Sequence, residues 1–286
     1  MLTDLVIDTF GADLREVVEL ARLAEQTGFD GVWSFDHLSG VVAGRPWSRD
    51  PFVTMGAIAA CTGRVRLVML VANLVNRHPA QLASAVSSLQ SLAPGRVMCG
   101  VGSGAAPGSK FGAEQLALGR TIDAFDARRD RLVEHVAALR AIWAGAASGD
   151  PVTVQGDHVT MRDVTAVVEP APTPPIVIGS LGVRTVRVAA AIADGVNIRR
   201  TPQLAELIDV VLRERRARTD PFEVSVFDRL DVDHPLGGDV DELVRLGVHA
   251  RTLFVSPPYP LDVVATVGEA CRTRLRGVAA SEGPPG

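Results

Sequence analysis

The sequence predicts an α/β protein that folds as a single (β/α)8 TIM barrel. Eight short apolar runs alternate with segments of helical periodicity over 286 residues, and one such barrel typically takes about 250 residues. An open, doubly wound sheet would show a glycine fingerprint after its first strand, and none follows Asp8. No strict short-period repeat is visible, which disfavours a solenoid. We expect one barrel domain over residues 1–276 and a disordered tail over residues 277–286.

The first half of the chain contains four of the predicted strands. Residues 14–27 carry an apolar stripe at helical spacing, with Asp13 as the N-cap and Gly28 at the end. Further helical segments begin at Pro51 and Pro79. The apolar runs between these helices are typical of parallel strands that are buried on both faces. The four strands are Leu5–Asp8, Gly31–Phe35, Val65–Ala72 and Arg96–Val101.

The second half of the chain continues the alternation after one excursion. The longest predicted helix is Thr121–Trp143, and the alternating segment Pro151–Val168 predicts a hairpin outside the main repeat. The remaining predicted strands are Ile176–Ile178, Gly195–Ile198, Phe222–Phe227 and Arg251–Val255, and the helices between and after them are 183–193, 202–218, 239–246 and 261–275.

Composition excludes several classes of function. A net charge of -4 gives no basic footprint for nucleic acid. No apolar run of 18 residues and no secretory leader is visible, so we expect a cytoplasmic protein without a membrane partner. The three cysteines are widely spaced and form no CxxC motif or cluster with histidine. A structural metal site or a disulfide framework is therefore not expected.

The active site of a (β/α)8 barrel lies at the carboxyl ends of its strands. In this chain that edge is rich in glycine and contains neither a nucleophile–base pair nor clustered metal ligands. Glycine turns that open helices suit a phosphate, because free amide N–H groups and the helix dipole favour an anion, although glycines also permit close packing. The residues at this edge are Asp8, Thr9, Asp36, His37, Ala72, Asn73, Gly102 to Gly104, Gly179 to Gly182, Asn197 to Arg199, Asp228, Arg229 and Ser256.

His37 is the sharpest single candidate for a catalytic residue. Its imidazole could bind a carbonyl or exchange a proton near neutral pH, and the alternative is a core histidine at a strand end. Asp36 should point to the other side of the strand, so a simple Asp–His dyad is not implied. Of the other histidines, we expect His135 on the surface of the long helix.

Five segments carry motifs that together are specific. They are G-F-D-G-V-W-S-F-D-H-L at 28–38, R-V-R-L at 64–67, R-H-P-A at 77–80, P-G-R-V-M-C-G-V-G-S-G at 94–104 and P-P-I-V-I-G-S-L-G-V-R-T-V-R-V-A-A-A-I-A-D-G-V-N at 174–197. These segments resemble the luciferase-like monooxygenase superfamily. The resemblance implies a (β/α)8 barrel with a short insertion, a bound coenzyme F420 or FMN at the strand ends, and a homodimer. The short layout favours the F420 branch, and thus an oxidoreductase that transfers a hydride between the deazaflavin and a small organic substrate.

The resemblance also implies roles for matching positions. Asp36 and His37 match a pair near the reactive ring, with His37 as the catalytic residue. Ala72 and Asn73 match a bulge behind the ring that often contains a non-proline cis peptide. The segments that match the surroundings of the cofactor chain and phosphate contain Gly102, Ser103, Gly104, Gly179, Ser180, Leu181 and Gly182.

One position departs from the family pattern. Sugar-phosphate dehydrogenases of the superfamily carry a glutamate directly after the glycines of the fourth strand, and this chain has Ala105 there. The resemblance therefore does not extend to sugar-phosphate oxidation. An FMN-dependent monooxygenase and a non-catalytic cofactor-binding homologue remain as alternatives, the second because of the missing glutamate.

Overall fold

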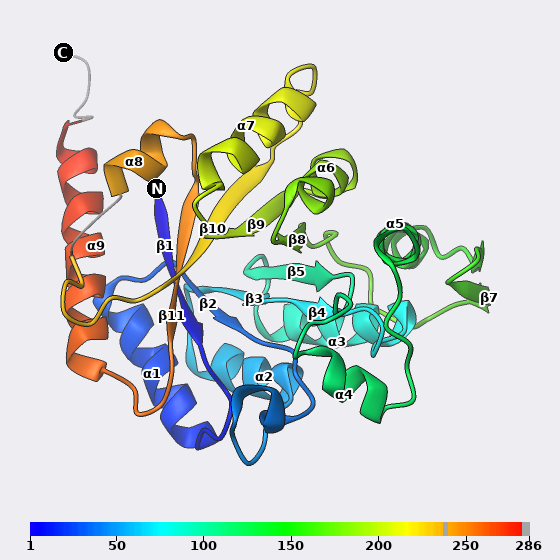
Figure 1. Cartoon of the computed structure of the whole chain (residues 1–286), viewed down its shortest axis with the longest axis horizontal. Helices are drawn as coiled ribbons and strands as arrows, with labels where there is room; N and C mark the ends of the chain where they lie inside the picture. Colours follow the sequence, from blue (N-terminus) through cyan, green and yellow to red (C-terminus); the bar gives the residue numbers. More distant parts are fainter. Residues whose placement is uncertain (237–239, 282–286) are drawn as a thin grey trace.

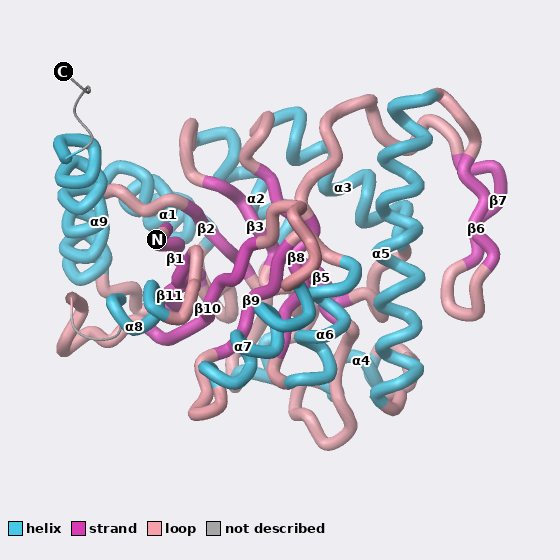
Figure 2. The backbone as a smooth tube through the Cα atoms, turned by 90° about the horizontal axis from the view of Figure 1, so that it is seen from above, coloured by secondary structure: helices cyan, strands magenta, loops and turns pink. Residues whose placement is uncertain are grey.

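The computed structural model describes residues 1–236 and 240–281 and shows a closed parallel barrel (Figures 1 and 2). Around the barrel the strands follow the order β3, β2, β1, β11, β10, β9, β8, β5, and pairing of β3 with β5 closes the ring. The predicted (β/α)8 fold is confirmed. The strands are β1 (Leu2–Ile7), β2 (Gly31–Ser34), β3 (Arg66–Met69) with its continuation β4 (Ala72–Asn73), β5 (Val97–Gly102), β8 (Ile176–Ser180), β9 (Gly195–Arg199), β10 (Glu223–Arg229) and β11 (Ala250–Val255).

Helices surround the barrel, and two shorter helical turns lie in the loops near its mouth (Figure 1). The expected cap of the first helix is confirmed, because Asp13 accepts a hydrogen bond from the Arg15 amide and Gly28 ends the helix at a φ of 125°. The helices are α1 (Leu14–Thr27), α2 (Pro51–Cys61), α3 (Pro79–Leu92), α4 (Gly112–Ala117), α5 (Phe125–Ser148), α6 (Val183–Ile192), α7 (Leu204–Arg215), α8 (Val240–Arg245) and α9 (Leu261–Ser281), with a 3-10 turn at Gly40–Ala43.

The predicted excursion is an antiparallel hairpin of β6 (Val152–Gln155) and β7 (Thr160–Val164). Figure 1 places it at the end of the molecule opposite α9, beyond α5. Glu134 of α5 holds its turn, since the carboxylate accepts hydrogen bonds from the amides of residues 157–159. The hairpin therefore extends the layer of helices and takes no part in the barrel sheet.

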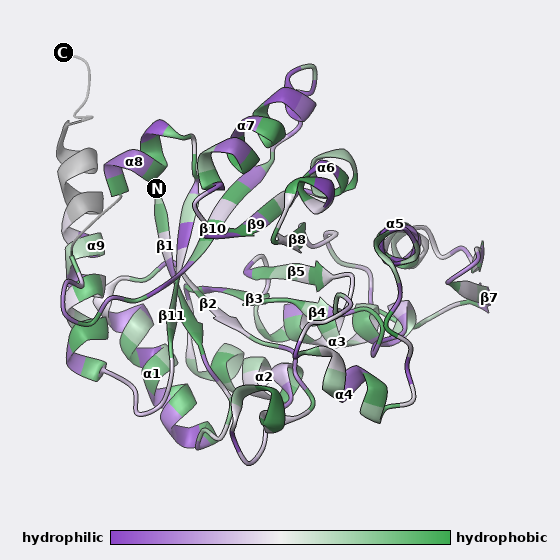
Figure 3. Cartoon of the chain, viewed as in Figure 1, coloured by the Kyte–Doolittle hydropathy of each residue, from purple (hydrophilic) through white to green (hydrophobic). Residues whose placement is uncertain are grey.

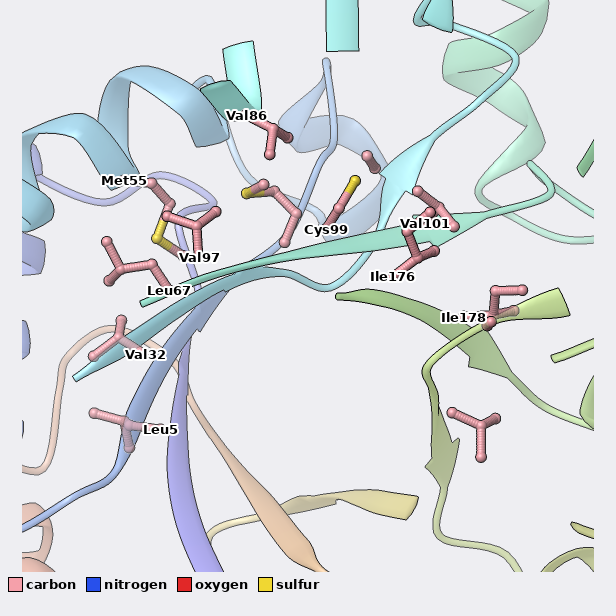
Figure 4. Close-up of a cluster of buried hydrophobic side chains, with 14 of the residues drawn as sticks. Leu5, Val32, Met55, Leu67, Val86, Val97, Cys99, Val101, Ile176 and Ile178 are labelled. Carbon is pink, nitrogen blue, oxygen red and sulfur yellow. The ribbon is translucent and has the colours of Figure 1, made fainter. Parts of the chain in front are cut away.

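The main core lies between the strands and the helices. Figure 4 shows outward-facing strand side chains such as Leu67 and Cys99 gathered near Met55 and Val86 of the helix layer. Figure 3 shows the same division by hydropathy, since the barrel strands are mostly hydrophobic and the helices carry both apolar and polar residues. A second, smaller cluster fills the inside of the barrel and consists of Val6, Trp33, Val68 and Val177. Alternate residues of each strand thus point outward and inward, as the pleat requires.

An ionic cluster closes the barrel near the start of its strands. Asp4 is fully buried and accepts hydrogen bonds from Trp33 Nε1 at 2.8 Å and from Arg66 Nε at 2.9 Å. Arg66 also pairs with Glu223. Burial raises the pKa of Asp4 to about 6, although Arg66 acts against this. This end of the barrel is therefore closed and has a structural role, and the open mouth of the barrel lies at the carboxyl ends of the strands.

Three details of the strands and helices differ from the sequence prediction. The third strand, expected over Val65–Ala72, divides into β3 and β4 at a cis peptide between Leu70 and Val71, so the bulge lies before Ala72 rather than at it. Helix α5 begins and ends later than the predicted Thr121–Trp143. It ends at Ser148 because Gly149, at a φ of 82°, is the glycine that caps it. An unpredicted helix, α4, follows the glycines of β5.

His135 is another correction, since it was expected on the surface and is only 4% exposed. Helix α5 packs against α3 and α6 and buries that face. His135 Nδ1 lies 2.9 Å from the Arg131 carbonyl oxygen, and burial lowers the histidine pKa to about 4. His135 is thus a core residue of the helix layer.

Helix α9 continues to Ser281, beyond residue 276, where we placed the end of the barrel domain. Residues 282–286 of the expected tail lie outside the described residues, as does residue 239 of the helix expected over 239–246. None of the helices in the described ranges is long and apolar enough to cross a membrane. Those same ranges contain no group of histidine, cysteine or acidic residues that could hold a metal ion.

Candidate active site

A cavity of about 530 Å³ opens at the carboxyl ends of the barrel strands. Its walls come from the ends of β1, β2, β9, β10 and β11 and from the loops after β2 and β5. The lining combines aromatic rings with charged groups. The residues are Asp8, Phe10, Phe35, His37, Ala43, Arg45, Lys110, Phe111, Arg199, Arg200, Phe227, Asp228, Arg229, Phe254 and Ser256.

Five of the nine phenylalanines of the chain line this cavity. The Phe35 and Phe254 ring centroids lie 5.5 Å apart, and those of Phe227 and Phe254 lie 6.0 Å apart. Offset and tilted rings at this spacing attract one another beyond simple burial. We call the five side chains the aromatic arc, and its members are Phe10, Phe35, Phe111, Phe227 and Phe254.

His37 stands at the edge of the aromatic arc, between two of its rings. The centroid of its imidazole lies 5.1 Å from that of Phe10 and 5.0 Å from that of Phe111, with the second pair stacked. Nδ1 lies 2.7 Å from Glu114 Oε1. An ionised carboxylate can only accept, so this contact places the imidazole proton on Nδ1. In neutral His37 the other nitrogen, Nε2, is then a hydrogen-bond acceptor.

Glu114 of α4 anchors both His37 and the loop that follows it. The carboxylate is buried, with the residue 3% exposed, and its Oε2 accepts hydrogen bonds from the amides of Leu38 at 2.9 Å and Ser39 at 3.2 Å. Burial acts to raise the pKa of Glu114, but the hydrogen bonds from His37 and from these amides lower it below its ordinary value. Glu114 is therefore held as the carboxylate that sets the tautomer and orientation of His37.

Asp36 serves the scaffold and does not contact His37 Nδ1. Arg77 donates two hydrogen bonds to its carboxylate, at 2.7 and 2.8 Å, and the amide of Asn73 donates a third at 2.9 Å. Such bidentate pairs fix geometry well. Asp36 thus ties the end of β2 to β4, and the carboxylate that contacts His37 Nδ1 belongs to Glu114.

The opposite wall of the mouth is built from glycines. A Cβ at Gly100 would lie 1.8 Å from the Met69 carbonyl oxygen, and a Cβ at Gly102 would lie 2.4 Å from Val71 Cγ2. A Cβ at Gly179 would lie 2.9 Å from Val71 Cγ1. These glycines leave space for the bulge at Leu70–Val71. We call the wall of β4, β5 and β8 ends the glycine arc, and its glycines are Gly100, Gly102, Gly104, Gly179 and Gly182.

The glycine arc continues into the start of α6, where groups that attract an anion gather. Gly182 is the N-cap of this ten-residue helix, and no side chain caps the first amides of the helix there. A Cβ placed on Gly182 would have no atom within 4 Å. Arg128 donates to the Gly104 carbonyl oxygen at 3.3 Å, and its buried Nε has no hydrogen-bond partner. Burial and the nearby Arg184 and Arg131 lower the Arg128 pKa. Two adjacent guanidinium groups beside a helix start fit a phosphate.

The structure brings together some predicted site residues and separates others. Asp8, His37, Arg199, Asp228, Arg229 and Ser256 line the cavity. The predicted cofactor residues Ala72, Asn73, Gly102, Ser103, Gly104, Gly179, Ser180, Leu181 and Gly182 lie instead along the glycine arc, where Ser180 Oγ accepts from the Gly182 amide and Leu181 is 70% exposed. The mouth therefore has two different walls.

Several residues of the site were missed from the sequence. Alternation along the strands would have found part of the aromatic arc, because Phe35, Phe227 and Phe254 stand two residues before the predicted His37, Arg229 and Ser256. Glu114 gave no such signal, since it lies 77 residues from His37 on the helix that was not predicted.

Comparison with known proteins gives consistent matches. A family model described as luciferase-like monooxygenase matches residues 4–230. F420-dependent glucose-6-phosphate dehydrogenase of Nakamurella multipartita is 33% identical over 187 residues, 63% of this chain and 50% of that protein. F420-dependent hydroxymycolic acid dehydrogenase of Mycobacterium tuberculosis is 29% identical over 180 residues, 63% of this chain and 47% of that protein. The chain spans about half the length of these curated relatives.

Solved structures show the same fold. A structure of an F420-dependent secondary alcohol dehydrogenase in complex with an F420–acetone adduct aligns with a TM-score of 0.79. The alignment covers 95% of this chain and 99% of that one at 20% identity. The similarity extends over the whole barrel.

Proposed function

Since the chain belongs to the luciferase-like monooxygenase family, we propose that it is an oxidoreductase that binds coenzyme F420 and transfers a hydride between the deazaflavin and a small organic substrate. Both curated relatives are F420-dependent by name, and the aligned alcohol dehydrogenase holds an F420 adduct. Bound in the mouth, the deazaflavin would supply the two-electron chemistry, and the protein would supply binding, orientation and proton handling.

The observation that carries this proposal is the anion site beside the glycine arc. The positive charge of Arg184 acts on Arg128, neither residue makes an ion pair in the described residues, and one buried Arg128 nitrogen has no hydrogen-bond partner. A phosphate at the start of α6 would satisfy these groups, so the residues present fit the phosphate of the cofactor. Gly182 leaves the backbone accessible there, because no atom lies within 4 Å of its Cβ position.

We assign the cofactor ring to the other end of the glycine arc. Val71 projects between Gly102 and Gly179 and offers an apolar surface at the mouth. Ala72 and Asn73 support this surface through β4, whose amide at Asn73 is fixed by Asp36. Gly102, Ser103, Gly104, Gly179, Ser180, Leu181 and Gly182 would then line the path from ring to phosphate.

His37 would act at the boundary between cofactor and substrate. Glu114 holds its proton on Nδ1, so Nε2 of the neutral ring can accept a proton from a substrate hydroxyl, or return it when the reaction runs in reverse. His37 is thus proposed as the catalytic residue and Glu114 as its positioning residue. The Ala105 amide is bound to Gln115 Oε1 at 3.1 Å, and the methyl side chain of Ala105 cannot donate a proton.

Anaerobic fluorescence titration with coenzyme F420 and, separately, with FMN tests the proposal. We expect F420 to bind, and Arg184→Gln to weaken its binding by about tenfold because one charge-assisted phosphate contact is lost. Arg187→Gln is the matched control, since Arg187 lies on the same helix and is exposed. Tight binding of FMN alone would favour the monooxygenase alternative, and binding of neither cofactor would refute both.

F420 binding without turnover of any substrate would favour the non-catalytic homologue instead. For assembly and location, we propose a homodimer in the cytoplasm, in line with the family resemblance. Light scattering of the purified protein tests the dimer, and a monomer at micromolar concentration would contradict it.

A further inference from the structure

We infer that the cavity takes a substrate with a flat apolar body and one anionic oxygen group, a carboxylate or a phosphate. This inference rests on the proposed function, because it assigns the substrate class of that same site. It depends on the aromatic arc, on a set of cations at its rim and on the separate location of the anion site at α6.

The rim carries more positive than negative groups. Its cations are Arg45, Lys110, Arg199, Arg200 and Arg229, and its acids are Asp8 and Asp228. Asp228 is neutralised by Arg200, whose Nε lies 2.6 Å from the carboxylate.

The other four cations make no ion pair within residues 1–236 and 240–281. Arg229 lies over the Phe254 ring and Lys110 over the Phe111 ring, with the cationic groups 5.3 and 5.1 Å from the ring centroids. These contacts hold the charges above the aromatic arc and leave their hydrogen-bond donors available to a ligand.

The floor beneath these cations is apolar and suits a flat body. Phe35, Phe227 and Phe254 pack on the interior cluster of the barrel. The centroids of their three rings lie 5.5 to 6.2 Å from one another. An apolar ring placed there would gain both burial and favourable ring contacts. A sugar would bury hydroxyl groups against these rings without partners, which costs free energy. Together with Ala105, the floor therefore disfavours a sugar phosphate.

The rim cations are not needed for the cofactor phosphate. Arg128 of α5 and Arg184 of α6 provide an anion site beside the glycine arc of β4, β5 and β8, whereas the rim cations come from the ends of β9 and β10 and from the loops after β2 and β5. The substrate anion is the remaining ligand for the second site. Its apolar body would then lie beside His37, which lines the same cavity.

Calorimetric titration of the F420-saturated protein tests the inference with matched small molecules. The compounds are 2-naphthoate, 2-naphthyl phosphate, the neutral 2-naphthamide, acetate and glucose 6-phosphate. We expect one or both naphthyl anions to bind at least about tenfold more tightly than the amide, and acetate and glucose 6-phosphate to bind more weakly than either. The comparison of the two naphthyl anions identifies which group the rim prefers.

Variants distinguish the rim from the cofactor site. Arg199→Gln and Arg229→Gln should each weaken binding of the naphthyl anion about three- to tenfold and leave 2-naphthamide unchanged. Arg213→Gln, on the outer face of α7, should change neither. Equal affinity for anion and amide, or no binding of any naphthyl compound, would overturn the inference.

A loss of F420 affinity in Arg199→Gln or Arg229→Gln that matches the loss of naphthyl anion affinity would assign the rim to the cofactor and also overturn the inference. The same titrations in the absence of F420 separate the two proposals. If F420 does not bind, the proposed function fails, while selective binding of the naphthyl anion would still establish the ligand class of the cavity.

Discussion

The two walls of the barrel mouth differ in their side chains, since one is built from glycines and the other from phenylalanines. The glycine arc removes side chains so that the backbone and the side chains of Val71 and Val75 can pack there. At four of its five glycines another atom lies within 3 Å of the Cβ position, and the exception is Gly182. The aromatic arc keeps large side chains and an open cavity of about 530 Å³ above them. His37 lies between the two. A wall with little conformational freedom therefore suits a fixed cofactor, whereas a wall of side chains suits a variable substrate.

The largest effect is expected at Gly100 of the glycine arc. In Gly100→Ala the new methyl group would meet the Met69 carbonyl oxygen at 1.8 Å, and backbone cannot move aside as a side chain can. We expect a loss of about 3 kcal/mol in the free energy of unfolding, measured with urea. The matched control is Gly56→Ala in α2, where the new Cβ meets no atom. There the higher helix propensity of alanine should raise the free energy of unfolding by about 0.5–1 kcal/mol. Equal stability of the two variants would show that the arc is not tightly packed.

The next effect concerns the boundary between the walls, at Glu114. In Glu114→Gln the side-chain oxygen can still accept from Leu38 and Ser39, but the amide nitrogen would donate to His37 Nδ1 and reverse the tautomer. We expect the ring proton to move to Nε2 in nitrogen-detected NMR spectra of the histidines. Turnover should fall about 100-fold with little change in F420 affinity.

His37→Ala should lower turnover by at least as much as Glu114→Gln, since it removes the group that Glu114 orients. Unchanged turnover in His37→Ala would contradict the catalytic role. An unchanged tautomer in Glu114→Gln would contradict the positioning role, even if turnover fell.

A smaller effect is expected within the aromatic arc. Phe254→Leu removes ring contact but leaves an apolar surface, so 2-naphthoate should bind about two- to fivefold more weakly. F420 affinity should not change, because Phe254 belongs to the other wall. Phe222→Leu is the control, since Phe222 packs against the outer core beside Arg215. A parallel loss of F420 affinity in Phe254→Leu would remove the distinction between the two walls.

The smallest effect concerns the pH dependence of stability at Asp8. Burial raises the pKa of Asp8 above its ordinary 3.8, against a hydrogen bond from the Phe10 amide and the charges of Arg45, His37 and Arg229. The folded state therefore favours the protonated acid, and its stability contribution is lost as pH rises from the unfolded pKa through the raised one. Asp8→Asn should lack this decline. Parallel curves of unfolding free energy against pH for the original protein and Asp8→Asn would contradict this role of Asp8.

The sequence predicted the barrel and its glycine wall better than the cavity. Apolar runs, Asp13 and Gly28 mark elements through local physics, so the strands and most helices were placed correctly. The glycines of residues 102–104 and 179–182 were visible because they are consecutive motifs. Their packing around Val71 was not, since it depends on a bulge that no local pattern indicates.

The cavity joins residues from distant strands, and tertiary geometry alone brings them together. Phe10, Phe111 and Phe254 are unremarkable in their own segments, and Glu114 reaches His37 from a helix too short to show periodicity. His135 was misplaced for the same reason, because its burial depends on α3 and α6 packing over α5.

A crystal structure of the protein with coenzyme F420 would show directly which wall of the mouth holds the cofactor. We predict that the deazaflavin ring lies against Val71 between Gly102 and Gly179, that its phosphate contacts Arg184 at the start of α6, and that the phenylalanine-lined cavity stays open beside His37. A ring stacked on Phe35 and Phe254, with the phosphate on Arg199 or Arg229, would contradict this division of the mouth.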